Sequence, residues 1–134
     1  MCGQEYWTIK AFPHLIDVGI MGHCVHGKTG LCAKAGVGCY QSGMFMEEPN
    51  MTVEDFKWIA EQCGGRVNQF ALGGRGDPDQ HERFEDILKI CRENGIVPNF
   101  TTSGYGMTPE IAALCEKYCG AVAVSWYRSD YTLR

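Results

Sequence analysis

The chain has 134 residues, enough for one domain with a hydrophobic core and too few for two. Sixteen acidic residues against twelve basic ones give a formal net charge of −4, so no basic face favours nucleic acid as a partner. No apolar run approaches the roughly 20 residues that cross a bilayer and no secretion signal precedes the first strand, so we expect a cytoplasmic protein without a membrane segment.

The first predicted element is a buried strand, Leu15 to Ile20, which is short and mostly apolar. A long stretch rich in glycine and cysteine follows, from residue 22 to about residue 46. It shows neither a helical nor a strand period, so we expect a loop. Loops of this length are uncommon in compact domains and usually functional.

Helices and strands then alternate. Thr52 and Asp55 form a capping box that begins a helix, and Gly64 follows its last apolar residue. A strand is predicted over 67–72. The next helix is expected to begin at Asp77 and Pro78 and to bury an apolar stripe at 84, 87, 88 and 91.

The last predicted elements are a strand over 97–102, a helix that begins at Thr108 and ends before Gly120, and a strand over 121–126. Strict alternation predicts an α/β fold with a parallel sheet, whose strands we expect to be apolar on both faces. The strand spacing suits a (β/α) barrel, but a complete barrel takes about 250 residues. We therefore expect a partial barrel of about four strands, in which 1–134 form a single truncated domain or pair with another chain. A complete, doubly wound sheet of four strands fits the pattern equally well.

The eight cysteines fall into distinct groups. Three of them lie on the apolar stripes of predicted helices and are expected to be small buried hydrophobic residues: Cys63, Cys91 and Cys115. No role is predicted for Cys2 or Cys119.

Cys24, Cys32 and Cys39 all lie in the irregular segment 22–46, where packing does not explain them. That segment follows the first strand, at the face of a barrel where active sites form. Three thiolates suit iron–sulfur or zinc. A structural zinc site needs a fourth ligand, which His23 or His26 could supply, whereas three thiolates on a four-iron cluster leave one iron open.

Several short motifs follow one another along the chain at the ends of the predicted strands. The cysteine-rich segment ends in Cys39-Tyr40-Gln41, and Gly73-Gly74-Arg75-Gly76-Asp77-Pro78 follows the second strand. The third strand ends in Thr101-Thr102-Ser103-Gly104, and the fourth ends near Ser125. Together these landmarks resemble the N-terminal half of the core domain of the radical S-adenosylmethionine (SAM) superfamily, with its Gly-Gly-Glu-Pro and Thr-Thr-Asn-Gly segments.

The chain departs from the pattern of that superfamily at two places. Seven residues separate Cys24 from Cys32 and six separate Cys32 from Cys39, where the superfamily usually has three and two. The acidic residue after the two glycines is Asp77, displaced by an apparent insertion at Arg75.

The resemblance implies the N-terminal half of a TIM-like radical SAM barrel, with a [4Fe–4S] cluster on Cys24, Cys32 and Cys39 in a cluster-binding segment, 22–46. It further implies that SAM binds the open iron and is cleaved reductively to a 5′-deoxyadenosyl radical, which abstracts hydrogen from an unknown substrate. The implied SAM contacts are Gly73, Gly74, Asp77, Ser103 and Ser125, and no side chain is assigned as catalytic.

The implied partners are an electron donor such as a flavodoxin or ferredoxin and the missing C-terminal half of the barrel. We expect the isolated chain to be inactive. Two alternatives remain at this point: a non-catalytic zinc-binding module that uses Cys24, Cys32, Cys39 and His23 or His26, and a fragment that folds poorly.

Overall fold

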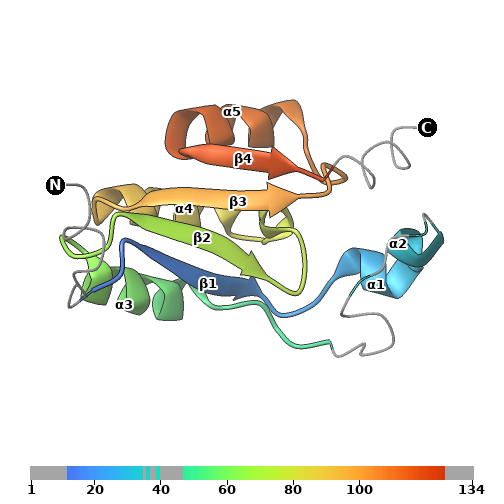
Figure 1. Cartoon of the computed structure of the whole chain (residues 1–134), viewed down its shortest axis with the longest axis horizontal. Coiled ribbons are helices and arrows are strands. Elements are labelled where there is room, and N and C mark those ends of the chain that lie inside the picture. The colour runs from blue at the N-terminus through green and yellow to red at the C-terminus, as the bar shows by residue number, and fades with distance from the viewer. Residues whose placement is uncertain (1–11, 35, 37–38, 40–46, 126–134) are drawn as a thin grey trace, which may run out of the picture.

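The computed structural model in Figure 1 describes residues 12–34, 36, 39 and 47–125. Four strands form one sheet in the order β1-β2-β3-β4, and every neighbouring pair is parallel. The strands are β1 (Leu15–Met21), β2 (Gln69–Gly74), β3 (Val97–Thr102) and β4 (Ala121–Val124). The helices are α1 (Val25–Thr29), α2 (Leu31–Lys34), α3 (Val53–Cys63), the 3₁₀ turn η2 (Pro78–Gln80), α4 (Phe84–Glu93) and α5 (Pro109–Tyr118).

The three longer helices connect consecutive strands and share one side of the sheet. Helix α3 contacts α4, and α4 contacts α5, so the helices follow the strand order (Figure 1). A doubly wound sheet would have helices on both faces, so that alternative is excluded. The expected partial (β/α) barrel is confirmed.

The hydrophobic core lies between these helices and the sheet. Alternate strand residues such as Ile20, Phe70 and Phe100 are buried on this side, because successive side chains in a strand point to opposite faces. The helices contribute Phe56, Ile87 and others to the same cluster. Cys63 and Cys91 are buried in it, as predicted, whereas Cys115 is only partly buried and packs against it.

The hydroxyl cap predicted at Thr52 is present, and Thr108 caps its helix in the same way. The Thr52 hydroxyl accepts a hydrogen bond from the amide of Asp55 at 3.1 Å, and Thr108 accepts one from Ile111 at 3.2 Å. These caps satisfy amide groups that have no partner inside the helix. They fix where α3 and α5 begin.

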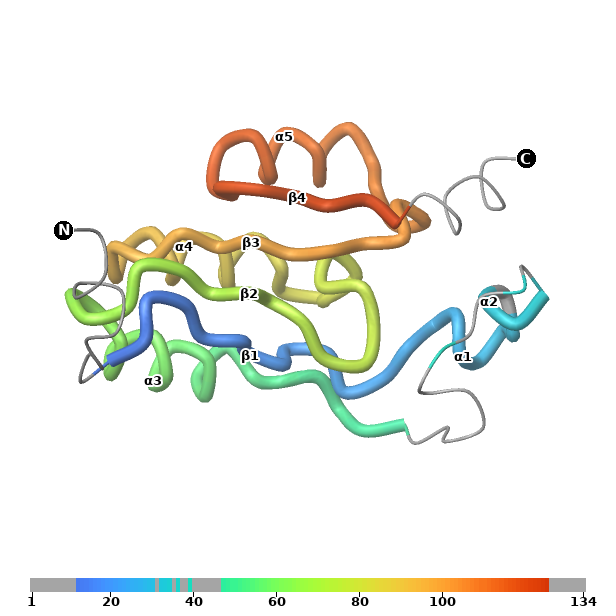
Figure 2. Tube along the Cα trace, viewed as in Figure 1, coloured from blue at the N-terminus to red at the C-terminus, as the bar shows by residue number. Residues whose placement is uncertain are grey.

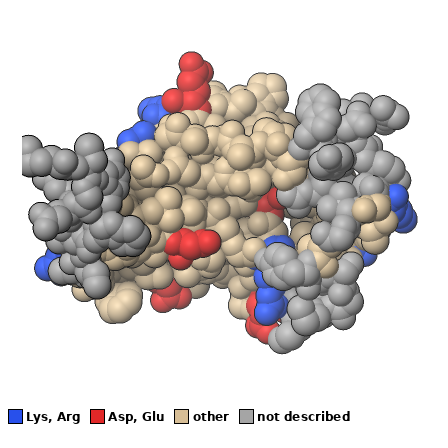
Figure 3. All heavy atoms as spheres, in the orientation of Figure 1, with Lys and Arg blue, Asp and Glu red and all other residues tan. Residues whose placement is uncertain are grey.

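The opposite face of the sheet carries small and polar residues, which corrects the expectation of strands that are apolar on both faces. One row across the sheet, given by the strand register, consists of Asp17, Ala71, Asn99 and Ala121. Nearer the carboxyl ends lie Gly19, Gly73, Thr101 and Ala123. None of the described helices α3, α4 and α5 covers this face, which we call the inner face. Figure 3 shows mostly uncharged residues on this side, with isolated acidic groups among them.

Other differences from the predicted elements have local causes. The segment expected as a loop contains α1 and α2, helices too short to show a helical period. Strand β2 begins at Gln69 rather than Val67, because the amide of Val67 donates to Cys63 O at the end of α3. The helix expected to begin at Asp77 and Pro78 begins only at Phe84, and the 3₁₀ turn that precedes it has no side-chain cap from Asp77.

No helix among the described residues is both long enough and apolar enough to cross a membrane.

Candidate functional site

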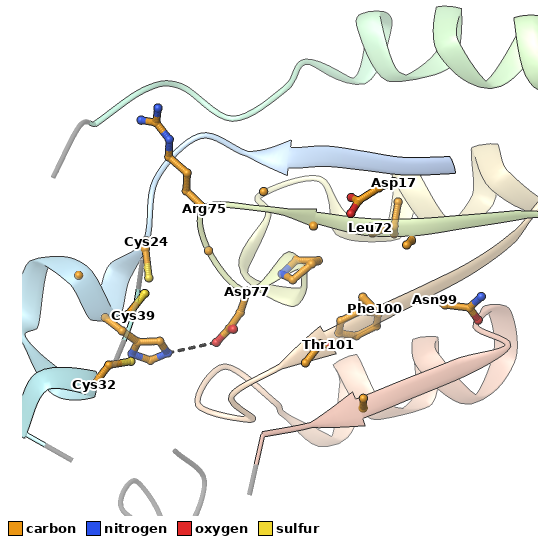
Figure 4. A pocket seen from close by; sticks show the side chains of 18 of the residues that line it. Asp17, Cys24, Cys32, Cys39, Leu72, Arg75, Asp77, Asn99, Phe100 and Thr101 are labelled. Atoms are coloured by element: carbon orange, nitrogen blue, oxygen red, sulfur yellow. Dashed lines mark hydrogen bonds and ion pairs between the residues drawn. The ribbon is translucent and has the colours of Figure 1, made fainter. Parts of the chain in front are cut away.

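A cavity of about 620 Å³ opens where the carboxyl ends of the strands meet the cysteine-rich segment. Its lining combines Cys24, Cys32 and Cys39 with the turn after β2 and with inner-face residues of all four strands. Figure 4 shows the three cysteines at one end of this cavity and Asp17 and Asn99 at the other. Sites of parallel α/β proteins form at this edge of the sheet.

The three cysteines come from different parts of one segment. Cys24 is the residue before α1, Cys32 lies in α2, and Cys39 follows. The chain reverses between the two helices at Gly30, whose φ of 66° is in the left-handed region that glycine adopts without strain. Both helices lie beyond the carboxyl ends of the strands (Figures 1 and 2), so all three cysteines reach the cavity from outside the sheet.

The three cysteines share one cavity without forming a ready-made site for a metal ion. Among the residues described, no three His, Cys, Asp or Glu side chains are close enough to hold one metal ion. A single zinc ion binds all its ligands itself, whereas a four-iron cluster binds each thiolate through a different iron. All three thiols are only partly buried and line the same cavity.

The two histidines that could complete a zinc site have other partners. His26 is 2 % exposed, and its Nε2 lies 3.1 Å from Asp77 Oδ2 and 2.8 Å from Ser103 Oγ. His23 Nδ1 lies 3.2 Å from the carbonyl oxygen of Glu48, on the protein surface. One nitrogen of each ring, Nε2 of His26 and Nδ1 of His23, is therefore engaged by these partners.

Asp77 and Ser103 form a buried pair at the edge of the cavity. The backbone amide of Ser103 donates to Asp77 Oδ1 at 3.1 Å, and the Ser103 hydroxyl donates to Oδ2. Burial acts to raise the pKa of the Asp77 carboxyl, but the hydrogen bonds from His26 and Ser103 outweigh it and hold that pKa below its ordinary value. Asp77 is therefore a buried carboxylate stabilised in its charged form.

Asp79, two residues further on, has the opposite environment. It is 4 % exposed, and within the described part of the chain neither of its carboxylate oxygens has a hydrogen-bond partner. Burial raises the pKa of the Asp79 carboxyl and the charge of Asp77 adds to the effect, whereas the nearby Thr102 hydroxyl opposes it. Asp79 does not line the cavity, so it carries an electrostatic cost without an evident ligand.

The two glycines after β2 differ in what requires them. A Cβ at Gly74 would lie 2.4 Å from the carbonyl oxygen of Met21, and its φ is 112°, so the packing of β1 against β2 demands glycine there. Among the described residues, a Cβ at Gly73 would meet just a carboxylate oxygen of Asp17, at 3.3 Å. Gly73 lines the cavity, and its missing side chain keeps the cavity floor open.

The predicted SAM contacts divide into two groups. Gly73, Gly74 and Asp77 line the cavity, whereas Ser103 and Ser125 do not. Ser103 is fully buried, with its hydroxyl engaged by Asp77 and His26. The amide of Ser125 donates to Thr102 O at 2.8 Å, beside the same strand end.

Sequence reasoning missed the contact between His26 and Asp77 and the polar residues of the inner face. The first joins residues 51 positions apart and leaves no local pattern. The second was detectable, because reading each strand with a period of two separates Asp17, Asn99 and Thr101 from the apolar residues between them.

Comparisons with known proteins give likeness only at the level of structure. No family model and no curated protein matches the chain. Streptococcus suis SuiB bound to precursor peptide SuiA matches with a TM-score of 0.63 at 17 % identity, over 84 % of this chain and 24 % of that one. SuiB bound to S-adenosylmethionine matches equally well, over 84 % of this chain and 25 % of that one.

BtrN in complex with AdoMet and 2-DOIA matches with a TM-score of 0.67 at 17 % identity, over 87 % of this chain and 46 % of that one. The chain thus spans between a quarter and a half of the length of these solved structures. At this identity the likeness shows the fold alone, which is the partial α/β barrel that the sequence predicted.

Proposed function

We propose that this chain, which has the fold of part of a radical SAM barrel, is the N-terminal half of a radical SAM core domain. One observation carries the proposal. Three thiols from a segment without a hydrophobic period share a single cavity with the diglycine turn, at the carboxyl edge of that half-barrel. Two of the solved structures with this fold hold S-adenosylmethionine, under that name or as AdoMet.

Cys24, Cys32 and Cys39 are the residues that would hold a [4Fe–4S] cluster, within a cluster-binding segment, 22–46. When bound, the cluster and SAM together supply one-electron chemistry, the reductive cleavage of SAM to a 5′-deoxyadenosyl radical. The protein holds both groups and keeps water away from them. Partial burial of the three thiols beside the cavity supports the first task.

The SAM-binding region in this proposal centres on the backbone at Gly73 and Gly74. Because nothing in the packing strongly requires glycine at position 73, the open floor there is best explained by the close approach of a ligand. Asp77 lines the same wall, and about one of its four acceptor positions remains after those taken by His26 and Ser103. Ser103 and Ser125 do not line the cavity, so they would support the SAM-binding residues from outside it.

The remaining strands of a barrel are the partner that the inner face implies. Helices cover one face of the sheet, and the other bears the cavity and exposed β4 residues such as Ala121 and Ala123. A closed barrel buries that face. We propose that a C-terminal half completes it, that an intracellular electron donor such as a flavodoxin or ferredoxin reduces the cluster, and that the chain alone does not turn over substrate.

The experiment that tests this function is anaerobic reconstitution of the full chain with iron and sulfide. The proposal expects a brown protein with about four iron atoms per chain and the visible absorption of thiolate-bound iron. A matched sample supplied with zinc tests the alternative module. A colourless protein that keeps one zinc ion per chain and takes up no iron would reject the cluster in favour of that module.

A further inference from the structure

The strongest unexplained feature near the cavity is a set of three mutually bonded polar side chains: His26 from α1, Asp77 from the turn after β2, and Ser103 from the end of β3. We propose that these three residues form a positioning clasp, which holds the cysteine-bearing segment against the carboxyl ends of β2 and β3. In this view Asp77 and Ser103 also act on the cysteines, through His26.

The hydrogen bonds of the clasp are complete and consistent. The Ser103 hydroxyl donates to Asp77 Oδ2, so it can accept from His26 Nε2 at 2.8 Å and from the amide of Tyr105 at 3.2 Å. The carboxylate only accepts. Nε2 faces both of these oxygens and must therefore carry a proton. The tautomer of His26 is thereby fixed by its two partners.

The ring of His26 is also fixed by an aromatic contact. The Tyr105 ring meets it edge to face, with ring centroids 5.1 Å apart and an angle of 84° between the planes. Tyr105 and Ser103 belong to the same loop after β3. The loop therefore holds the imidazole both through its hydrogen bond and through its ring.

The clasp is the buried side-chain attachment of the cysteine segment among its described residues. Of the side chains described between residues 23 and 34, only that of His26 is buried. Helices α1 and α2 have five and four residues, and isolated helices this short are not stable in water. His26 lies two residues after Cys24 and six before Cys32, so fixing its ring restricts where both thiols can stand.

A backbone contact strengthens the same attachment. A Cβ at Gly76 would lie 2.4 Å from the carbonyl oxygen of His23, so the turn after β2 packs directly against the start of the cysteine segment. This contact sets the distance between the turn and the cysteine segment. The clasp then fixes the orientation of the segment, because its hydrogen bonds require one orientation of the imidazole.

The role of the clasp rests on the proposed function, because positioning the thiols matters only if they hold a cluster. Whether the clasp attaches the segment can be tested without that function. The test is therefore hydrogen exchange of the full chain without iron. Two informative amides are those of Lys28, which donates to Cys24 O, and Lys34, which donates to Gly30 O. The variants are His26→Leu, which removes the donor, and His26→Gln, which keeps an N–H donor. His23→Ala is the matched control from the same segment.

The clasp predicts that His26→Leu speeds exchange over residues 25–34 by about tenfold or more, while amides of β1 and β3 keep their protection. His26→Gln should recover part of that protection, and His23→Ala should match the wild type. Asp77→Asn should resemble His26→Leu, because it removes the charge that the imidazole contacts. Equal exchange of segment 25–34 in the wild type and His26→Leu would overturn the clasp.

Anaerobic reconstitution of the same proteins separates the two proposals. If the wild type binds iron, His26→Leu should retain several-fold less of it than His23→Ala after gel filtration, and His26→Gln should retain more than His26→Leu. If the wild type binds no iron while the exchange differences appear, the proposed function fails and the clasp stands. If His26→Leu retains as much iron as His23→Ala, the positioning role is wrong.

Discussion

Cysteines on the two sides of the sheet differ in how far they are buried. On the helix-covered face, Cys91 is fully buried beside leucine, isoleucine and phenylalanine side chains. Beyond the inner face, Cys24, Cys32 and Cys39 are half-buried and line a cavity. A cysteine's chemistry depends on this setting, because a thiol packed in apolar surroundings is held in its neutral form while an accessible one can become a thiolate ligand.

The carboxylates near the cavity show a similar contrast. Asp77 is buried with its charge satisfied by His26 and Ser103, and it belongs to the cavity wall. Asp79 is equally buried, but its carboxylate oxygens have no hydrogen-bond partner among the described residues, and it is not part of that wall. The two carboxylates therefore have opposite environments, and we expect Asp77 to be stabilised and Asp79 destabilised in the charged form.

The largest expected effect is on metal content. Cys32→Ala should abolish iron retention after anaerobic reconstitution, because two thiolates from this segment cannot replace three. Cys91→Ala should bind as much iron as the wild type and lose about 1 kcal/mol of stability through lost packing. Iron analysis and thermal unfolding of both variants measure this. Equal iron contents in the two variants would remove the distinction between the cysteine groups.

The next effect concerns thiol reactivity in the chain without iron. Burial raises the pKa of Cys91 to about 12, and burial with the neighbouring Cys115 raises that of Cys119 to about 12. At pH 8 only about one in ten thousand of such thiols is ionised, so alkylation there should be about a thousandfold slower than at an ordinary thiol. Mass spectrometry after timed iodoacetamide treatment should show the cavity cysteines modified first. Early modification of Cys91 would refute its assignment as a buried thiol of low reactivity.

The two glycines after β2 should respond differently to alanine. Gly74→Ala should lower the free energy of unfolding by at least about 1 kcal/mol, because its φ and its contact with Met21 both oppose a Cβ. Gly73→Ala should leave stability nearly unchanged and weaken SAM binding about tenfold or more. Denaturant unfolding and calorimetric titration of the reconstituted protein distinguish these effects. Unchanged SAM affinity in Gly73→Ala would argue against ligand approach there.

The smallest effect is on stability at Asp79. Asp79→Asn should raise the free energy of unfolding at pH 7 by about 1 kcal/mol, because it removes a buried charge without a hydrogen bond. The pKa of Asp79 is raised in the folded state, so that state holds more protons, and stability falls as pH rises from the ordinary carboxyl pKa through the raised one. The free energy of unfolding, measured from pH 4 to 8, should no longer show this decrease with pH in Asp79→Asn.

Asp77→Asn serves as the opposite control. The pKa of Asp77 is lowered by folding, so its contribution is present above the ordinary carboxyl pKa and is lost as pH falls through the folded value. The variant should therefore be less stable than the wild type at pH 7. If both substitutions change stability in the same direction, the contrast between the two carboxylates is wrong.

Much of this fold was predictable because its signals are local. The cap at Thr52, the apolar stripe of α4 and the boundaries of β3 all follow from residues close in sequence. The alternation of elements then limits the topology. The sequence marks segment 22–46 as functional, because its cysteines follow no hydrophobic period. The helices within it are too short to produce a detectable pattern.

The wall of the site was harder to predict because its contacts are long-range. Asp77 does not cap a helix with its side chain, which instead meets residues 51 positions before it and 26 after it. Its contact with SAM stays a prediction. Ser103 looked like a turn residue or a SAM contact and is fully buried in the same network. Such pairings depend on strand register and loop path, which no single window of sequence contains.

The central claim is that three thiolates hold a cluster with one open iron beside the turn at Gly73. Electron paramagnetic resonance of the reduced, reconstituted chain, recorded with and without SAM, tests it most directly. The account predicts a spectrum of a reduced [4Fe–4S] cluster that changes when SAM is added, and no such spectrum in Cys32→Ala. A cluster signal that SAM leaves unaltered, or one that persists in Cys32→Ala, would contradict it.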